Sequence, residues 1–198
     1  MKQQVLIING GDAFDTYELY LNDLKSKTPK LERLRPGGWK GNFQTALGED
    51  YDVFVAQMPN SQNAQYTEWK IWFEKIMSLV DEGIILVGHS LGGIFLAKYL
   101  SENNSQKKIK ALILLAAPYC TREENHLAGF DLENLEYVSS QVEKIFIYHS
   151  KDDPVVPFED AEKYAKALRN AEMKVFEDKM HFNQSEFPEL AQNILNLH

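Results

Sequence analysis

Short apolar runs punctuate the chain, and this pattern constrains its fold more than any other feature. Helical patterns or long connections separate each run from the next. Near-continuous apolar strands that alternate with helices are typical of a parallel sheet covered on both faces. The sequence therefore predicts an α/β fold in three layers, with a mainly parallel sheet of about six strands. The runs are residues 5–8, 53–56, 84–87, 111–116, 145–148 and, more weakly, 174–176.

Three of the intervening segments have a clear helical period. The first, residues 68–80, places its large side chains on one stripe: Trp69, Trp72, Phe73, Ile76, Met77 and Val80. We interpret this stripe as packing against the sheet rather than as a ligand site. Residues 158–168 and 187–197 predict two further helices beside the sheet. Residues 28–48 are interrupted by prolines and glycines and give no clear helical prediction.

The length of 198 residues fits one domain, residues 1–198, with a sizeable core. Between residues 117 and 141 the pattern breaks down into charges, one glycine and scattered leucines. We expect an irregular excursion above the sheet there, and it is the candidate for a short lid.

Charge and cysteine content exclude several classes of function. The net charge of −8 argues against a nucleic-acid partner, because phosphate binding needs clustered Lys and Arg. The densest basic spot, at Lys107, Lys108 and Lys110, is interpreted as a solvated turn before a strand. No apolar stretch is long enough for a signal peptide or a membrane span. Since Cys120 is the single cysteine, no internal disulfide is possible, and we expect a cytoplasmic protein. The charge and cysteine content do not indicate an oligomeric state.

The pentapeptide Gly88-His89-Ser90-Leu91-Gly92 matches the motif G-x-S-x-G. An apolar run leads into it and a helix-like run, residues 94–100, follows it. This context predicts a nucleophile elbow, in which Ser90 stands on a sharp, strained turn from strand to helix. Glycine is needed at positions 88 and 92, because strand and helix cross closely and a Cβ would push them apart.

A serine hydroxyl needs a base within hydrogen-bond reach, and that base needs an orienting carboxylate. Asp152 and Asp153 lie where the run 145–148 ends, so either can face the elbow, and the other has the ordinary role of starting a turn before Pro154. His181 lies on a loop before the last helix. The order Ser, Asp, His matches the order in α/β-hydrolases. The remaining histidines are weaker candidates for the base: His89, His126, His149 and His198.

With these three motifs, the chain resembles the small, nearly cap-less α/β-hydrolases grouped with the retinoblastoma-binding serine hydrolase and the YdeN-type bacterial proteins. The resemblance covers nearly the whole chain. In that family the acid commonly precedes x-x-V-P, and the segment Asp153-Pro154-Val155-Val156-Pro157 fits this pattern. The resemblance therefore implies Asp153 as the triad acid, with Asp152 as the alternative, and His181 as the base.

An oxyanion hole needs two backbone N–H groups, one from the residue after the serine and one from the loop after an early strand. Leu91 supplies the first, and by the family's register Gly11 supplies the second. Many relatives have His-Gly where this chain has Asn9-Gly10, so Asp12 remains an alternative donor. The same turn lacks the G-x-G-x-x-G of a dinucleotide site, and no metal-binding spacing is present. We predict no cofactor and no metal.

The expected activity is hydrolysis of a small-molecule acyl substrate, an ester or thioester, through an acyl-enzyme on Ser90. Two alternatives stay open: an amide or peptide hydrolase with the same triad, and a non-enzymatic binding module on the same scaffold. We expect a modest apolar substrate pocket. Its predicted contributors are Phe14, Tyr17, Pro118, Tyr119 and Phe182.

Overall fold

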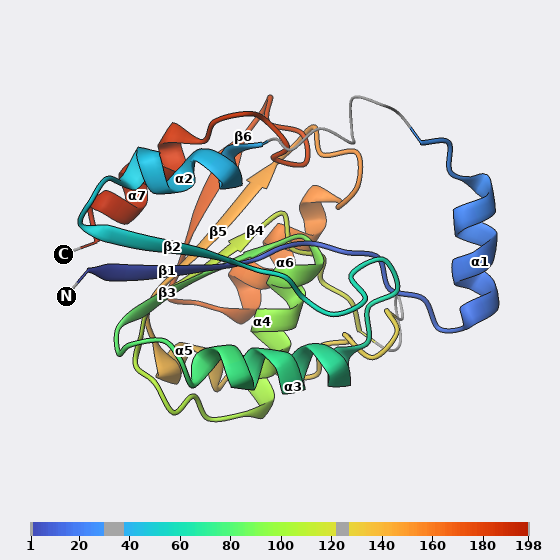
Figure 1. Cartoon of the computed structure of the whole chain (residues 1–198), viewed down its shortest axis with the longest axis horizontal. Coiled ribbons are helices and arrows are strands. Elements are labelled where there is room, and N and C mark those ends of the chain that lie inside the picture. The colour runs from blue at the N-terminus through green and yellow to red at the C-terminus, as the bar shows by residue number, and fades with distance from the viewer. Residues whose placement is uncertain (1, 30–37, 122–126, 198) are drawn as a thin grey trace.

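A computed structural model describes residues 2–29, 38–121 and 127–197 of the chain (Figure 1). Its core is a six-stranded, wholly parallel sheet in the order β2-β1-β3-β4-β5-β6. All six predicted runs are strands, which confirms the α/β fold. Two of the histidines weighed as bases, His126 and His198, lie outside the described residues. The strands are β1 (Gln3–Ile8), β2 (Tyr51–Ala56), β3 (Ile84–His89), β4 (Ile109–Leu115), β5 (Val142–Ser150) and β6 (Ala171–Phe176).

Helices cover both faces of the sheet, as Figure 1 shows. One face carries α2 (Trp39–Leu47) and α7 (Pro188–Leu195). The other face carries α3 (Tyr66–Met77), α4 (Leu91–Glu102), α5 (Val138–Gln141) and α6 (Phe158–Ala167). Along β1, alternate side chains enter the two separate apolar clusters, as the period of a strand requires. The predicted three layers are confirmed.

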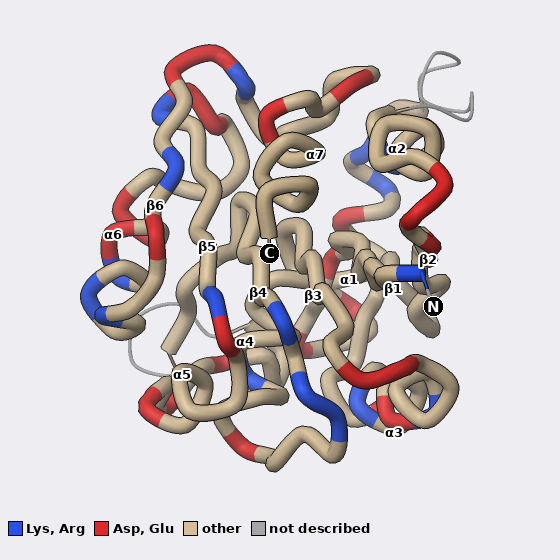
Figure 2. Tube along the Cα trace, turned by 90° about the vertical axis from the view of Figure 1, so that its left-hand side faces the viewer, with Lys and Arg blue, Asp and Glu red and all other residues tan. Residues whose placement is uncertain are grey.

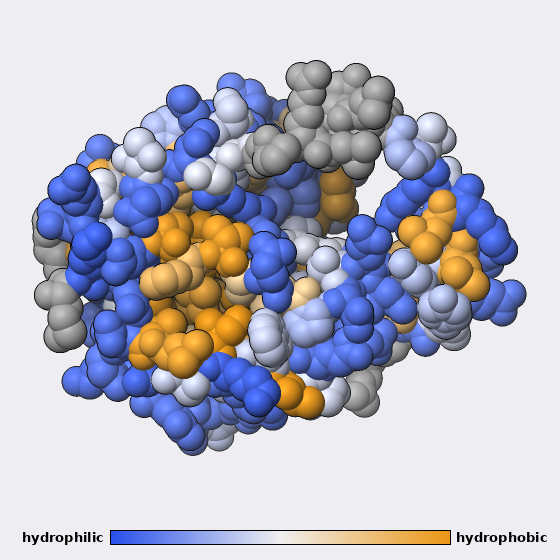
Figure 3. Space-filling view, viewed as in Figure 1, coloured by the Kyte–Doolittle hydropathy of each residue, from blue (hydrophilic) through white to orange (hydrophobic). Residues whose placement is uncertain are grey.

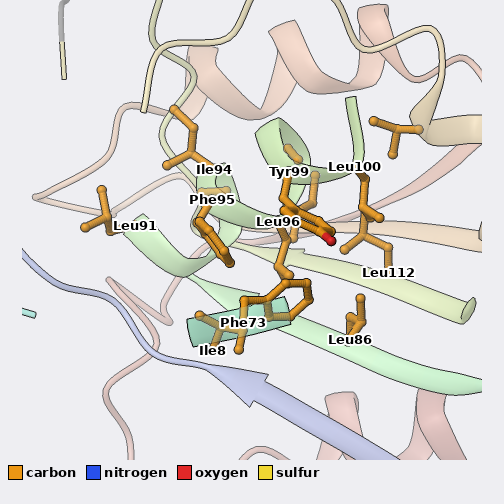
Figure 4. Packing of buried hydrophobic residues seen from close by; sticks show 14 of the residues in the cluster. Ile8, Phe73, Leu86, Leu91, Ile94, Phe95, Leu96, Tyr99, Leu100 and Leu112 are labelled. Carbon is orange, nitrogen blue, oxygen red and sulfur yellow. The ribbon is translucent and has the colours of Figure 1, made fainter. Parts of the chain in front are cut away.

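Helix α4 is the central helix of the larger cluster. Every residue from Leu91 to Leu100 is buried, so this helix is buried on all sides rather than along one stripe. Its Phe95 ring lies edge-on to Phe73 of α3, 5.3 Å between ring centroids. Figure 4 shows Phe73, Phe95 and Leu96 filling the space between α3, α4 and the sheet. Because this helix begins directly after Ser90, its packing fixes the position of the candidate nucleophile.

Two helix predictions need correction. Helix α3 ends at Met77 instead of continuing to Val80, and Trp72 is 43% exposed rather than part of the core stripe. The buried stripe consists of Trp69 and Phe73, four residues apart, and Trp72 falls to the side of it. Helix α2 lies in the segment that gave no helical prediction, and it tolerates Gly41 in its interior.

Helix α1 (Tyr17–Ser26) was also not predicted and has no buried residue. Its N-cap is Thr16, whose Oγ1 accepts a hydrogen bond from the Leu19 N–H at 3.2 Å. Figure 1 shows α1 standing to one side of the sheet and its helices, and Figure 3 shows apolar side chains exposed on it. Leu19 and Leu24 of this helix are 50% and 40% exposed.

The excursion at residues 117–141 is described except for residues 122–126. Its later part is anchored in the core: Phe130 is fully buried between the rings of Tyr66 and Trp69. The Lys98 ammonium of α4 also donates to the Asp131 carbonyl oxygen at 2.7 Å. The segment predicted to form a short lid is therefore tied to helices α3 and α4 on its C-terminal side.

Acidic and basic residues are interspersed along the elements that Figure 2 draws. Of the three lysines predicted to form a turn before a strand, Lys107 and Lys108 directly precede β4, whereas Lys110 lies within it. Within the described ranges, no helix has the length and apolar character that a membrane span needs.

Candidate active site

The sharp turn predicted at Ser90 is present between β3 and α4. Ser90 has φ 56° and ψ −125°, a conformation that non-glycine residues rarely adopt. Its N–H donates to the Leu115 carbonyl of β4 at 2.8 Å, and its own carbonyl accepts from the Gly93 N–H at 2.8 Å. These two bonds hold the strained backbone between the sheet and the first turn of the helix.

Three glycines allow the backbone to close around Ser90. A Cβ at Gly88 would lie 2.5 Å from the Gly92 carbonyl oxygen, which confirms the close crossing of β3 and α4. A Cβ at Gly92 would lie 2.3 Å from the Ile8 carbonyl oxygen. The missing side chain at Gly92 therefore makes room for the end of β1, not for β3. A Cβ at Gly10 would lie 2.8 Å from the Ser90 Cβ, so the loop after β1 reaches the serine itself.

The structure brings Asp153 and His181 together. Nδ1 of His181 lies 2.8 Å from Oδ2 of Asp153, and the Asp153 side chain has no exposed surface. The other carboxylate oxygen accepts from the N–H groups of Val155 at 2.8 Å and Val156 at 3.1 Å. Burial alone would raise the pKa of Asp153, but the hydrogen bonds from His181 and the two N–H groups outweigh it and lower that pKa. Asp153 is thus a buried, ionised carboxylate aimed at His181.

Asp152 has a different set of contacts. Its Oδ1 accepts from the Ser150 hydroxyl at 2.5 Å and from the Met180 N–H at 2.9 Å. The Ser150 hydrogen bond is the largest cause that lowers the pKa of Asp152. Ser150 Oγ also accepts from the Lys179 N–H at 3.0 Å. Asp152 therefore holds the backbone on which His181 stands, whereas Asp153 contacts the imidazole.

Residues 179–184, called here the histidine loop, are strained on both sides of His181. Met180 has φ 48° and Phe182 has φ 52°. From the N-terminus of α2, the indole N–H of Trp39 donates to the Phe182 carbonyl at 3.0 Å. The Trp39 backbone N–H donates to the Gln184 carbonyl, also at 3.0 Å. Helix α2 is thereby docked onto the histidine loop.

His89, the second residue of the pentapeptide, links the elbow to that loop. Its ring is buried, with Nε2 2.9 Å from the His181 carbonyl oxygen and Nδ1 2.9 Å from the Lys40 Nζ. The His89 and His181 ring centroids are 4.9 Å apart. Burial, then the charges of Lys40 and His181, hold the pKa of His89 well below its usual range. Burial lowers the pKa of Lys40 to about 8. Lys40 and Trp39 were missed, because α2 itself gave no signal in the sequence.

The two candidate N–H donors in the turn after β1 are in different situations. The Asp12 N–H donates to the Ser61 carbonyl at 2.9 Å, while the Gly11 N–H makes no hydrogen bond within the described part of the chain. Gly11 fits tightly there, since a Cβ would lie 2.2 Å from the same Ser61 oxygen. Leu91 is the first residue of α4, where the N–H has no partner inside the helix.

The predicted pocket residues are dispersed. Tyr17 borders a hollow of about 560 Å³ whose other walls are Tyr20, Met58, Asn60, Ser61, Gln62, Asn63, Gln65 and Glu68. The Phe14 ring packs 5.7 Å from Tyr20, next to this hollow. The wall is largely polar rather than apolar, and it adjoins Gly11 through Ser61.

The other three predicted pocket residues lie elsewhere. Pro118 and Tyr119 follow β4 and are partly exposed. The Pro118 carbonyl accepts from the Tyr164 hydroxyl at 2.9 Å, and the Tyr119 N–H donates to Asp160 at 3.0 Å. Phe182 is fully buried and stacks on Phe187, 5.2 Å between centroids. The Phe182 ring is thus part of the core beneath α7.

Together, the parallel sheet, the strained turn after β3 and the loops at the carboxyl ends of the strands define an α/β-hydrolase fold. The profile of the serine hydrolase family matches residues 29–195, and the chain belongs to this family. No curated protein matches the sequence.

Solved structures share the fold at low sequence identity. The ydeN gene product of B. subtilis is 18% identical with a TM-score of 0.77, over 99% of this chain and 98% of that one. A bromoperoxidase from Bacillus anthracis is 15% identical with a TM-score of 0.67, over 100% and 92%. A meta-cleavage product hydrolase from Pseudomonas fluorescens is 14% identical with a TM-score of 0.66, over 98% and 90%. The chain thus spans nearly the whole length of these proteins.

Proposed function

We propose that this serine hydrolase cleaves a small acyl ester or thioester through an acyl-enzyme on Ser90. The observation that carries the proposal is the buried pair of Asp153 and His181, whose Oδ2 and Nδ1 atoms are 2.8 Å apart. His181 lies on the histidine loop, which His89 ties directly to the elbow. An ionised, solvent-shielded carboxylate on one imidazole nitrogen is the arrangement that makes the other nitrogen a general base.

In the first half-reaction, the Ser90 hydroxyl attacks the substrate carbonyl carbon while Nε2 of His181 takes its proton. Asp153 accepts from Nδ1–H, which fixes the tautomer and stabilises the imidazolium that forms. The tetrahedral intermediate collapses with its C–O or C–S bond broken, and the imidazolium gives the proton to the leaving alcohol or thiol. Water, activated by the same histidine, then attacks the acyl-Ser90 ester and releases the carboxylic acid and the free serine.

The negative oxygen of each tetrahedral intermediate needs donors that are already in place. We assign these to the N–H groups of Leu91 and Gly11. The Leu91 N–H is at the N-terminus of α4, where the helix dipole also favours negative charge. Gly11 is preferred to Asp12, because the Asp12 N–H already donates to Ser61.

The substrate contacts that we propose lie on two sides of the elbow. Phe14 and Tyr17 border the hollow next to the oxyanion loop, while Pro118 and Tyr119 follow β4. Since Gly93 of α4 is packed against Ala117, the segment after β4 starts beside the elbow helix. We also propose a cytoplasmic location, because a chain with a single cysteine, Cys120, can form no internal disulfide.

A substrate panel tests the reaction class. Purified protein and the Ser90→Ala variant are compared on p-nitrophenyl acetate, an acyl thioester and an acyl anilide. We expect ester and thioester hydrolysis that the variant loses, with a correctly folded variant confirmed by circular dichroism. Preference for the anilide would instead indicate an amide hydrolase with the same triad. Equal ester hydrolysis by the variant and the parent would rule out Ser90 as the nucleophile.

A further inference from the structure

Lys40 makes an unusual contact for a lysine side chain: its ammonium is largely buried and its hydrogen-bond partner is an imidazole nitrogen. Nζ lies 2.9 Å from Nδ1 of His89. An ammonium group has three donors and no lone pair, so Nδ1 must be the acceptor. On the other side of the same ring, Nε2 lies 2.9 Å from the His181 carbonyl oxygen, which can only accept. Lys40 and this carbonyl therefore require one state of His89, the neutral tautomer with its proton on Nε2.

The tautomer matters because the His89 side chain holds the backbone carbonyl of His181, the proposed base, through this hydrogen bond. His181 lies between two residues with positive φ, Met180 and Phe182, and such strain persists only where surrounding contacts enforce it. Trp39 holds the carbonyl of Phe182, and His89 holds the carbonyl of His181. The opposite tautomer of His89 would aim a lone pair at the His181 carbonyl oxygen and lose the tie.

We propose that Lys40 is a positioning residue for the hydrolase reaction, because its donation to His89 fixes the tautomer that holds the backbone of His181. The assignment rests on the proposed function of Ser90, Asp153 and His181. Lys40 touches neither the substrate nor the reacting atoms, so its effect is on the geometry of the base and thus on kcat more than on KM.

Loss of the Lys40 proton removes this constraint. A neutral amine has a lone pair and can accept from Nδ1–H, so both tautomers of His89 become accessible. Burial lowers the pKa of Lys40 to about 8, so the ammonium loses its proton at mildly alkaline pH. Among the described residues, the titratable groups that face this contact are His89 on β3 and, beyond it, His181 on the histidine loop, while the Trp39 ring of α2 lies 5.6 Å from Nζ. No carboxylate of the described residues contributes to the shift of the Lys40 pKa.

Kinetics over a range of pH test the proposal. The wild-type kcat for p-nitrophenyl acetate should fall on the alkaline side with an apparent pKa of about 8. Lys40→Met should lower kcat at neutral pH by roughly 10- to 100-fold, the order expected for a misplaced catalytic group, with little change in KM and no alkaline fall. Lys40→Arg keeps a donor that does not titrate, so it should retain more of the neutral-pH rate and also lack the alkaline fall. Lys144→Met, which removes an exposed lysine of β5, is the matched control and should keep the wild-type profile.

Nitrogen NMR of the wild-type imidazoles tests the same idea without any variant and without activity. The His89 signals should report the Nε2–H tautomer at pH 7 and a mixture of tautomers above the pKa of Lys40. A proton on Nδ1 of His89 at pH 7 overturns the proposal, as does a Lys40→Met enzyme with the wild-type kcat and the wild-type alkaline fall. If wild-type hydrolysis were insensitive to Ser90→Ala, the proposed function would fail instead, whatever the tautomer of His89.

Discussion

The elbow at Ser90 and the histidine loop both contain strained backbone, but they are held in different ways. The elbow is held by backbone packed against backbone: a single added Cβ at Gly88 or Gly92 would come within 2.5 Å or 2.3 Å of a carbonyl oxygen. The histidine loop is held by side chains from α2, β3 and the turn after β5, namely Trp39, His89 and Asp152. One region is thus built by close packing of backbone segments and the other by hydrogen bonds from side chains.

This difference determines how each region should respond to substitution. Close packing has no tolerance for added volume, so changes at the elbow should act mainly on folding. The histidine loop is held by hydrogen bonds from several segments at once. A single substitution there should therefore leave the fold intact and change the position of His181 and the reaction rate.

Asp153→Asn should lower kcat by about 10⁴-fold, because an amide presents its NH₂ to Nδ1 and favours the wrong tautomer of His181. The fold should persist, since the amide oxygen can still accept from the N–H groups of Val155 and Val156. The matched change Asp152→Asn should cost far less, because its amide oxygen can still hold the Met180 N–H. Equal losses in kcat for the two variants would contradict the assignment of Asp153.

Gly92→Ala should destabilise the protein by about 3 kcal/mol or more, or prevent folding, since the new methyl group meets the fixed carbonyl oxygen of Ile8. The control is Gly41→Ala in α2, where an added Cβ has nothing within 4 Å. That change should stabilise the protein by about 0.5–1 kcal/mol. Denaturant unfolding of both variants measures the difference, and a tolerated Gly92→Ala would show that the elbow is less tightly packed than described.

Stability and activity should move in opposite directions at alkaline pH. The folded protein lowers the pKa of Lys40 from 10.5 to about 8, so between these values the unfolded chain binds more protons at this site than the folded one. Burying the ammonium therefore costs stability below pH 8, and the cost, roughly 3 kcal/mol, is relieved as pH rises toward 10.5. The free energy of unfolding of the wild type, taken relative to Lys40→Met, should rise across this window. A flat difference would indicate that Lys40 is more hydrated than its burial implies.

Trp39→Phe removes the indole N–H that donates to the Phe182 carbonyl and leaves that oxygen without its partner. We expect a loss of about 1–2 kcal/mol in unfolding free energy and a several-fold loss in kcat, smaller than that of Asp153→Asn. Trp72→Phe is the control, because Trp72 is 43% exposed on α3 and the change should stay within about 0.5 kcal/mol. If Trp39→Phe left kcat unchanged, the docking of α2 would not position the histidine loop.

The sequence predicts the sheet and the elbow well because each leaves a recognisable pattern within a short stretch of residues. Each strand is a continuous apolar run, and the glycines of the pentapeptide are required by neighbours within a few residues or by the adjacent strand end. Trp72 and the true end of α3 were predicted wrongly, because a helical stripe read from hydrophobicity does not say which of two neighbouring aromatic residues faces the sheet.

The environment of the candidate base could not be predicted in the same way. Trp39 and Lys40 are separated from His181 by more than half of the chain. In addition, glycines at the ends and in the interior of α2 interrupt the helical period of its sequence. Asp152 and Asp153 are adjacent in sequence and chemically alike, so only their contacts distinguish the residue that holds the loop from the one that contacts the imidazole. The polar hollow beside Tyr17 likewise combines residues from α1 with residues 58–68.

The most direct test of the central claim is labelling with a fluorophosphonate probe, followed by intact mass and peptide mapping. Such probes react with a serine that a neighbouring base has activated, and they require no knowledge of the substrate. We expect one adduct per chain, on Ser90, that is absent in Ser90→Ala and forms much more slowly in Asp153→Asn. A folded wild-type protein that forms no adduct, or an adduct that persists in Ser90→Ala, would contradict the assignment of Ser90 as an activated nucleophile.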